Sequence, residues 1–107
     1  MRHAAFSWQA VAHMSAGRWH EAMVALDQAL ALEPNFIHAC GFKAIVCSRE
    51  GHPDEAHKLM ARARELEPQL TLALWESRLR CLFFRFPTWD EMLQHLRMAW
   101  AATESAA

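Results

Sequence analysis

Hydrophobic positions recur at helical spacing along the chain and are interrupted at regular intervals. In the first third of the chain, one apolar stripe precedes Gly17 and a second stripe runs from Gly17 to Pro34. Apolar residues three or four apart lie on one face of an α-helix, and a proline ends such a pattern. The first stripe contains Phe6, Ala10 and His13, and the second contains Ala22, Leu26, Ala29 and Leu30. This pattern predicts two helices joined by a turn at Gly17.

The same unit returns after 34 residues, because Pro34 recurs as Pro68 and 68 minus 34 is 34. Gly17 likewise recurs as Gly51. Other matches at this interval are Ala5 with Ala39, Ala10 with Ala44, Glu21 with Glu55, Ala22 with Ala56, Ala29 with Ala63, and Leu32-Glu33 with Leu66-Glu67. Chance would give roughly two or three identities in such a window, so the chain contains a duplicated structural unit, and this period is typical of a solenoid.

A third unit follows in a degraded form. The segment 70–84 is densely apolar and has no internal proline or glycine, which predicts a further helix. The sequence Thr88-Trp89-Asp90-Glu91 has the form of a capping box and predicts a last helix through about Ala102. We therefore expect an all-α fold, a right-handed α-solenoid of three antiparallel helix pairs whose third pair is degenerate. We expect one domain over residues 1–107, with repeats at about 3–36, 37–70 and 71–104.

The period and the residues at its fixed positions resemble the tetratricopeptide repeat. The resemblance covers residues 3–68 and rests on the repeated alanines, glycines and prolines. Small side chains let paired helices approach closely, so several alanines are expected to be buried at helix crossings. These are Ala22, Ala29, Ala56 and Ala63. From residue 69 onward the resemblance is weak, because Arg78 stands where Ala10 and Ala44 stand in the first two units.

Residues 64–97 also resemble the tail of bacterial repeat domains that follow a signalling output domain, such as a class III nucleotide cyclase or a DNA-binding regulator. This resemblance implies an alternative function. The chain would then be a regulatory or dimerisation segment of a larger bacterial signalling enzyme or transcription regulator.

Composition and charge fit an ordinary globular protein. Of the 107 residues, 53% are hydrophobic and 21% are charged, and the formal net charge is -1. These values disfavour nucleic acid as a partner. No apolar run approaches membrane-spanning length, and Gln9 and His13 interrupt the N-terminal apolar stretch before a signal core forms, so we expect no membrane partner. The three cysteines are an odd number without a Cys-x-x-Cys pair, which favours a cytoplasmic location.

Residues able to support chemistry do not form a catalytic or metal-binding pattern in the sequence. No two histidines are three or four residues apart, and Cys40 and Cys47 would lie roughly 10 Å apart along a helix, too far to share a metal ion without another ligand. Cys81 is the best candidate nucleophile, but it follows Cys47 by one full repeat and is expected on the packing face of its helix. The sequence has no glycine-rich phosphate loop. We therefore expect no enzyme activity, no metal and no cofactor.

The resemblance and helix geometry together predict a binding groove formed by the first helix of each pair. Residues at spacings of three, four and three lie on one stripe of each of these helices. The predicted groove consists of Ser7, Val11, Met14, His38, Ile45, Ser48, Leu72, Trp75, Leu79 and Leu82, with Ala4 and Gly41 on the same stripes. The groove becomes more apolar toward the third pair, so we expect it to bind an apolar helix or extended peptide of a protein partner. Because the stripes carry no Lys, Arg or Asn, we do not expect the groove to grip a C-terminal carboxylate.

The last helix predicts self-association. It carries more apolar side chains than one neighbouring helix can cover, and a large exposed apolar patch is usually an interface. These side chains are Met92, Leu93, Leu96, Met98 and Trp100. We therefore expect a homodimer that forms through the third repeat.

Overall fold

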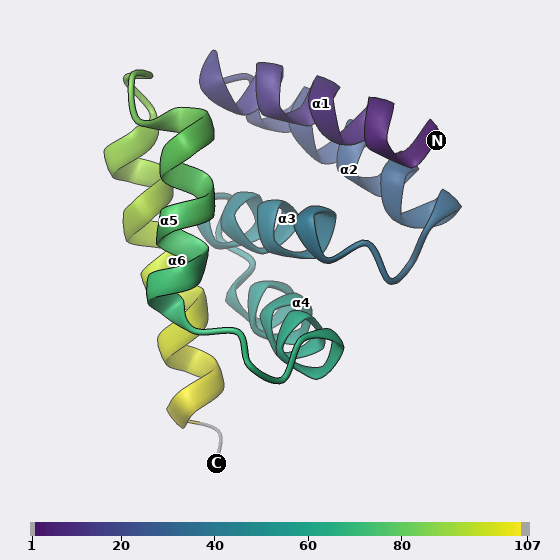
Figure 1. The fold of residues 1–107 in the computed structure, drawn as a ribbon. Helices are drawn as coiled ribbons and strands as arrows, with labels where there is room; N and C mark the ends of the chain where they lie inside the picture. Colours follow the sequence, from purple (N-terminus) through teal and green to yellow (C-terminus); the bar gives the residue numbers. More distant parts are fainter. Residues whose placement is uncertain (1, 106–107) are drawn as a thin grey trace.

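The computed structural model describes residues 2–105, and within this range the chain forms six α-helices. They are α1 (Arg2–Ser15), α2 (Trp19–Leu32), α3 (Ile37–Arg49), α4 (Pro53–Leu66), α5 (Leu72–Phe83) and α6 (Trp89–Ser105). Consecutive helices form three antiparallel pairs, which Figure 1 shows from purple α1 to yellow α6. The prediction of an all-helical fold with six paired helices is confirmed.

The turns of the first two pairs have the same structure. Gly17 has a φ of 76° and Gly51 has a φ of 84°, a left-handed conformation that a side chain would strain. The residue after each glycine donates its N–H to the carbonyl oxygen five residues earlier, at 2.8 Å in both turns. Each glycine donates to the carbonyl three residues earlier, at 3.1 and 3.3 Å. This pair of hydrogen bonds is a Schellman motif, which satisfies the last carbonyls of α1 and α3.

Alanines lie at the helix crossings of both regular pairs. Ala22, Ala29 and Ala63 are 0% exposed and Ala56 is 1% exposed, as the repeat pattern predicts. Ala10 and Ala44 on the facing helices are also fully buried. Small side chains on both sides of a crossing allow α1 to pack closely on α2, and α3 on α4.

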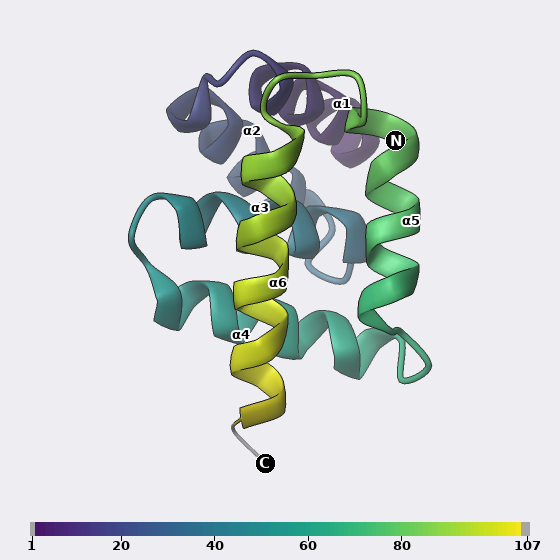
Figure 2. The same cartoon turned by 90° about the vertical axis from the view of Figure 1, so that its left-hand side faces the viewer.

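The third pair lies across the other four helices instead of continuing their stack. Figures 1 and 2 show α5 and α6 running at a steep angle to α1, α2, α3 and α4. Helix α6 packs against α3 and α4 more extensively than against its own partner α5. Arg78 occupies the position of the crossing alanines, and its guanidinium binds Glu67 at the end of α4. A side chain of this size and charge cannot form the close crossing seen in the first two pairs.

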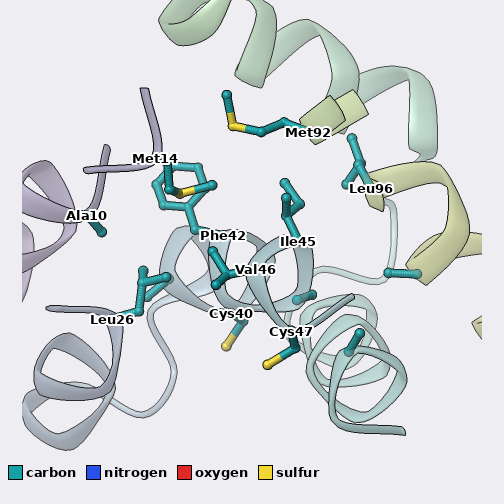
Figure 3. Close-up of a cluster of buried hydrophobic side chains, with 14 of the residues drawn as sticks. Ala10, Met14, Leu26, Cys40, Phe42, Ile45, Val46, Cys47, Met92 and Leu96 are labelled. Atoms are coloured by element: carbon teal, nitrogen blue, oxygen red, sulfur yellow. The ribbon is translucent and has the colours of Figure 1, made fainter. Parts of the chain in front are cut away.

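The core joins all three pairs. Figure 3 shows Met14 from α1, Ile45 from α3, and Met92 and Leu96 from α6 converging in one cluster. Trp100 is 5% exposed and its ring lies 4.5 Å from the guanidinium carbon of Arg64 on α4. Two helices, α3 and α4, therefore cover α6.

The prediction that the last helix exposes an apolar surface is wrong for three of the five side chains named for it. Met92, Leu96 and Trp100 are 1%, 0% and 5% exposed, and only Met98 is strongly exposed, at 53%. The expectation assumed that one neighbouring helix covers α6, but α6 crosses two helices and also contacts α5.

Candidate functional site

The concave side of the first two pairs is filled by the third pair. Met14, Ile45, Trp75 and Leu79, all expected to line an open groove, are at most 2% exposed. Met14 and Ile45 lie in one cluster with Met92 and Leu96 of α6, and Trp75 of α5 packs against Gly41 of α3. Met14, Ile45 and Trp75 are therefore not accessible to a peptide in this structure.

Trp75 fits against α3 because residue 41 is a glycine. A Cβ atom at Gly41 would lie 2.7 Å from Trp75 Cζ2 and closer still to Cη2, inside any normal carbon contact. The His38 ring meets the indole edge-on, with 6.4 Å between ring centroids. The mid-helix glycine of α3 therefore provides the space into which a fully buried tryptophan packs.

The C-terminal half of α3 is covered by α6. Ser48 Oγ lies 2.9 Å from His95 Nδ1, and Arg49 Nε donates to Glu91 Oε1 at 2.8 Å. The Ser48 hydroxyl is therefore already hydrogen-bonded within the chain. Leu72, the first residue of α5, is half-buried against the core.

An apolar cleft lies open between α1, the N-terminal half of α3, and α5. It has a volume of about 410 Å³. Its lining residues are Ala4, Ser7, Trp8, Val11, Phe36, His38, Phe42, Arg78, Leu79, Cys81 and Leu82. From the predicted groove, the cleft brings together Ser7, Val11, His38, Leu79 and Leu82. The structure therefore splits the predicted groove into a part closed by the third pair and a part that forms this cleft.

Several cleft residues were not predicted from the inner stripes. Trp8 and Phe36 lie beside those stripes, and Arg78 and Cys81 belong to a different face of α5. The density of aromatic residues around Ser7 and His38 in the sequence is a signal that could have identified Trp8 and Phe36. No sequence feature indicates that α5 faces α1 across a cleft, because this depends on the steep angle of the third pair.

The cleft has little net charge. The guanidinium of Arg78 binds both carboxylate oxygens of Glu67, at 3.2 and 3.0 Å, in a bidentate ion pair. Burial lowers the pKa of His38 below its ordinary value, and the nearby Arg78 charge lowers it further, against a smaller opposing effect of Glu67. The imidazole of His38 is thus held in its neutral form near pH 7. Such a cleft favours an uncharged ligand group.

Ser7 is a buried polar residue with an unsatisfied hydroxyl in the cleft wall. It is 6% exposed, and its Oγ has no hydrogen-bond partner within residues 2–105. By contrast, Ser15 on the same helix donates its hydroxyl to the carbonyl oxygen of Val11 at 2.8 Å. A buried hydroxyl without a partner is destabilising by about 1–3 kcal/mol.

The cysteines differ in exposure. Cys40 and Cys47 are buried, and burial raises the pKa of the Cys47 thiol to about 11. Cys81 is exposed and lines the cleft, so the expectation that it lies on a packing face is wrong. The reason is that α5 buries Trp75, Leu79 and Phe83, a stripe that leaves position 81 on the side toward α1.

Neither a metal cluster nor a membrane span is found in the described part of the chain. Residues 2–105 contain no group of three or more His, Cys, Asp and Glu side chains that could hold a metal ion. None of the six helices described is both long and apolar enough to cross a membrane.

Comparison with known proteins identifies one family. Residues 13–76 match a family model described as tetratricopeptide repeat. The match spans more than half of the chain, from the end of α1 into the first half of α5, and leaves most of the third pair outside. No curated protein matches the chain.

Proposed function

Because the chain belongs to the tetratricopeptide repeat family, we propose that it is a protein–protein interaction module without catalytic activity of its own. Stacked helix pairs of this kind expose extended surfaces to partners. The observation that carries the proposal is the open apolar cleft of about 410 Å³ between α1, α3 and α5. The three cysteines are all free thiols, which is consistent with a role in the reducing cytoplasm.

The energetics favour the cleft over the concave face as the binding site. To open the concave face, a partner would have to displace the third pair and expose six large buried side chains. These are Trp75, Leu79, Phe83, Met92, Leu96 and Trp100. At about 1.5–3 kcal/mol for each, their burial contributes roughly 9–18 kcal/mol. This is comparable with the whole stability of a domain, about 5–15 kcal/mol, so a partner helix cannot compete for the same surface.

We propose that the partner inserts an apolar part of a helix or extended segment into the cleft. Trp8, Val11 and Leu82 offer apolar walls near the opening. Arg78 lies at the cleft but is already paired with Glu67, so it attracts a ligand carboxylate only weakly. The partner side chain that enters the cleft should therefore be uncharged.

The expected homodimer through the third repeat remains a proposal. The apolar residues of α6 that were to form this contact are largely buried in the monomer. A dimer through the third repeat would therefore use its exposed apolar side chains, which are Leu74, Phe84, Phe86 and Met98.

Selection from a displayed library of random peptides tests the proposed site. Peptides of about 11 residues, enough for three helical turns, would be selected on the wild-type chain. They would then be measured against Leu82→Glu, which places a charge in the cleft wall, and against Val24→Glu on α2. Val24 is 46% exposed and is not among the residues that line the cleft, so it is the matched control.

We expect selected peptides to be rich in uncharged apolar residues and to bind Val24→Glu like the wild type. Binding to Leu82→Glu should fall at least about tenfold, because a carboxylate must be desolvated in the cleft. Equal binding to both variants, or no enrichment on the wild type, contradicts the proposed site. Circular dichroism on each variant checks that the helical fold is retained.

A further inference from the structure

The exposed face of α1 carries no charge between its ends. The sequence from His3 to Gly17 has no Lys, Arg, Asp or Glu. Its exposed residues after Arg2 are Ala5, Trp8, Gln9, Ala12 and Ala16. Helix α2, by contrast, exposes Glu21 and Asp27. A solvent-facing side of a helix normally carries charged and polar residues, so the uncharged exposed face of α1 is unusual for a surface that stays solvated.

Trp8 stands on this face, beside the cleft. At 63% exposure it is the most exposed large apolar side chain among residues 2–105. It lines the cleft and also a second, more open hollow shared with Leu82 and Phe86. An exposed indole is enriched at protein interfaces, because its ring is a large apolar surface and its N–H is a hydrogen-bond donor.

Ser7 complements Trp8 chemically. A serine hydroxyl can accept a hydrogen bond, and the indole Nε1–H can only donate one. Ser7 Oγ is buried in the cleft wall without a partner in the chain. The exposed indole of Trp8 thus lies beside a cleft whose wall holds a buried hydroxyl without a partner among residues 2–105.

A protrusion and a matching hollow on one surface are what a two-fold symmetric dimer requires, because each copy presents the same patch to the other. The absence of charge on α1 also removes the repulsion that identical charged faces would produce. The small residues Ala5 and Ala12 would let two α1 helices approach closely. We propose that the partner of the cleft is a second copy of this chain, with Trp8 of each copy inserted into the cleft of the other.

This proposal rests on the proposed function and names the partner of the same site. The third pair fits a symmetric contact less well. Its exposed rings lie among charges, since the guanidinium carbon of Arg85 lies 5.1 Å from the ring centroid of Phe84. Arg80 is exposed one turn before Phe84. Two identical copies of that surface would bring arginines together.

Sedimentation velocity over the micromolar range tests the dimer, using the wild type, Trp8→Ala and the matched control Phe84→Ala. Phe84 is a similarly exposed ring, at 53%, on the third pair. We expect a concentration-dependent dimer for the wild type and for Phe84→Ala. Trp8→Ala should weaken dimerisation at least roughly a hundredfold, because each dimer loses two central aromatic side chains.

Reactivity of Cys81 with a thiol reagent reports whether the dimer uses the cleft. Cys81 is the exposed thiol, and Cys40 and Cys47 are buried. The labelling rate of wild-type Cys81 should fall as the protein concentration rises, and that of Trp8→Ala should not change.

A wild-type chain that stays monomeric overturns the proposal, and so does a dimer that Trp8→Ala leaves intact. A dimer in which Cys81 stays fully reactive also overturns it, because the cleft is then empty. If the chain is monomeric but still selects peptides that Leu82→Glu fails to bind, the second copy is ruled out and the proposed function stands. If neither a dimer nor peptide binding is found, both fail.

Discussion

The first two helix pairs and the third pair follow the same plan in sequence but are held together differently. In the first two, fully buried alanines lie at each crossing and a left-handed glycine closes each turn. In the third, Arg78 replaces the crossing alanine, and the turn between α5 and α6 has no glycine. The third pair contacts the other helices mainly where α6 packs against α3 and α4.

We infer from this difference that the crossing residue influences whether a repeat packs on itself or on its neighbours. A pair that packs closely on itself leaves its inner face free, as α1 with α2 and α3 with α4 do. A pair that cannot do so buries its apolar side elsewhere, and here the available surface is the concave face.

Removal of Trp75 should have the largest effect, because this side chain links the third pair to α3. Trp75 is 0% exposed, so Trp75→Ala should lower the free energy of unfolding by about 3–5 kcal/mol. Urea unfolding followed by circular dichroism measures the change. Trp8→Ala is the matched control and should change the stability of the monomer by only about 0.5 kcal/mol or less. Equal losses for the two variants would show that Trp75 is not an anchor of the third pair.

Enlargement of a crossing alanine should disturb a regular pair. Ala56→Leu inserts three carbons where α4 packs on α3 and should cost about 1–3 kcal/mol through overpacking. Ala31→Leu, on the exposed side of α2, makes the same change without a crossing and should be close to neutral. An unchanged thermal midpoint for Ala56→Leu would contradict the close packing of the second pair.

The effect of Gly41→Ala on stability should have opposite signs with tryptophan and with alanine at position 75. In the wild type, the new methyl group meets the Trp75 ring and should destabilise the chain by about 1–2 kcal/mol net of the better helix propensity of alanine. In the Trp75→Ala background the obstacle is gone, and the same substitution should stabilise by about 0.5–1 kcal/mol. A double-mutant cycle measures this coupling. Additive effects would mean that the two residues do not share one space.

The smallest effect concerns His38, which lies where the two regions meet in the cleft. Burial and the Arg78 charge lower the pKa of His38 from its ordinary 6.5. The folded chain therefore binds a proton less readily than the unfolded chain. The stability contributed by neutral His38 is complete above about pH 6.5 and is lost as the pH falls from there toward the folded pKa.

Urea midpoints at about pH 7.5 and about pH 5.5 measure this dependence. His38→Asn should lose less stability between the two values than the wild type. His20→Asn, at an exposed position on α2, should behave like the wild type. Equal losses in all three proteins would remove His38 as a source of the pH dependence.

Local pattern was sufficient to predict the helices and the crossings. Period, helix breakers and small residues are features of neighbouring positions, so Gly17, Gly51 and the buried alanines could be located from the sequence. The apolar stripe of α5 was also recognised through Trp75 and Leu79. A stripe identifies which face is buried, but it does not tell which surface of another helix covers that face.

The arrangement of the third pair could not be predicted for this reason. A continued regular stack predicts that α5 lines an open groove. In the structure, α5 instead packs Trp75 against α3. Gly41 and Arg78 are the sequence features that point to this arrangement, because a glycine inside a helix often has a packing reason and Arg78 is too large for a close crossing. The exposure of Cys81 follows from the same arrangement, since α5 does not keep the register of α3.

The closure of the concave face by the third pair is tested most directly by thiol labelling of the folded, monomeric chain. A cysteine would be placed on the concave face as Ile45→Cys in a Cys81→Ser background, and its reactivity compared with that of native Cys81 in the cleft. Ile45 is 0% exposed, whereas Cys81 is exposed. The account predicts rapid labelling of Cys81, and labelling at position 45 only at the rate at which the chain unfolds. Labelling at position 45 as fast as at Cys81 would show that the third pair leaves the concave face open.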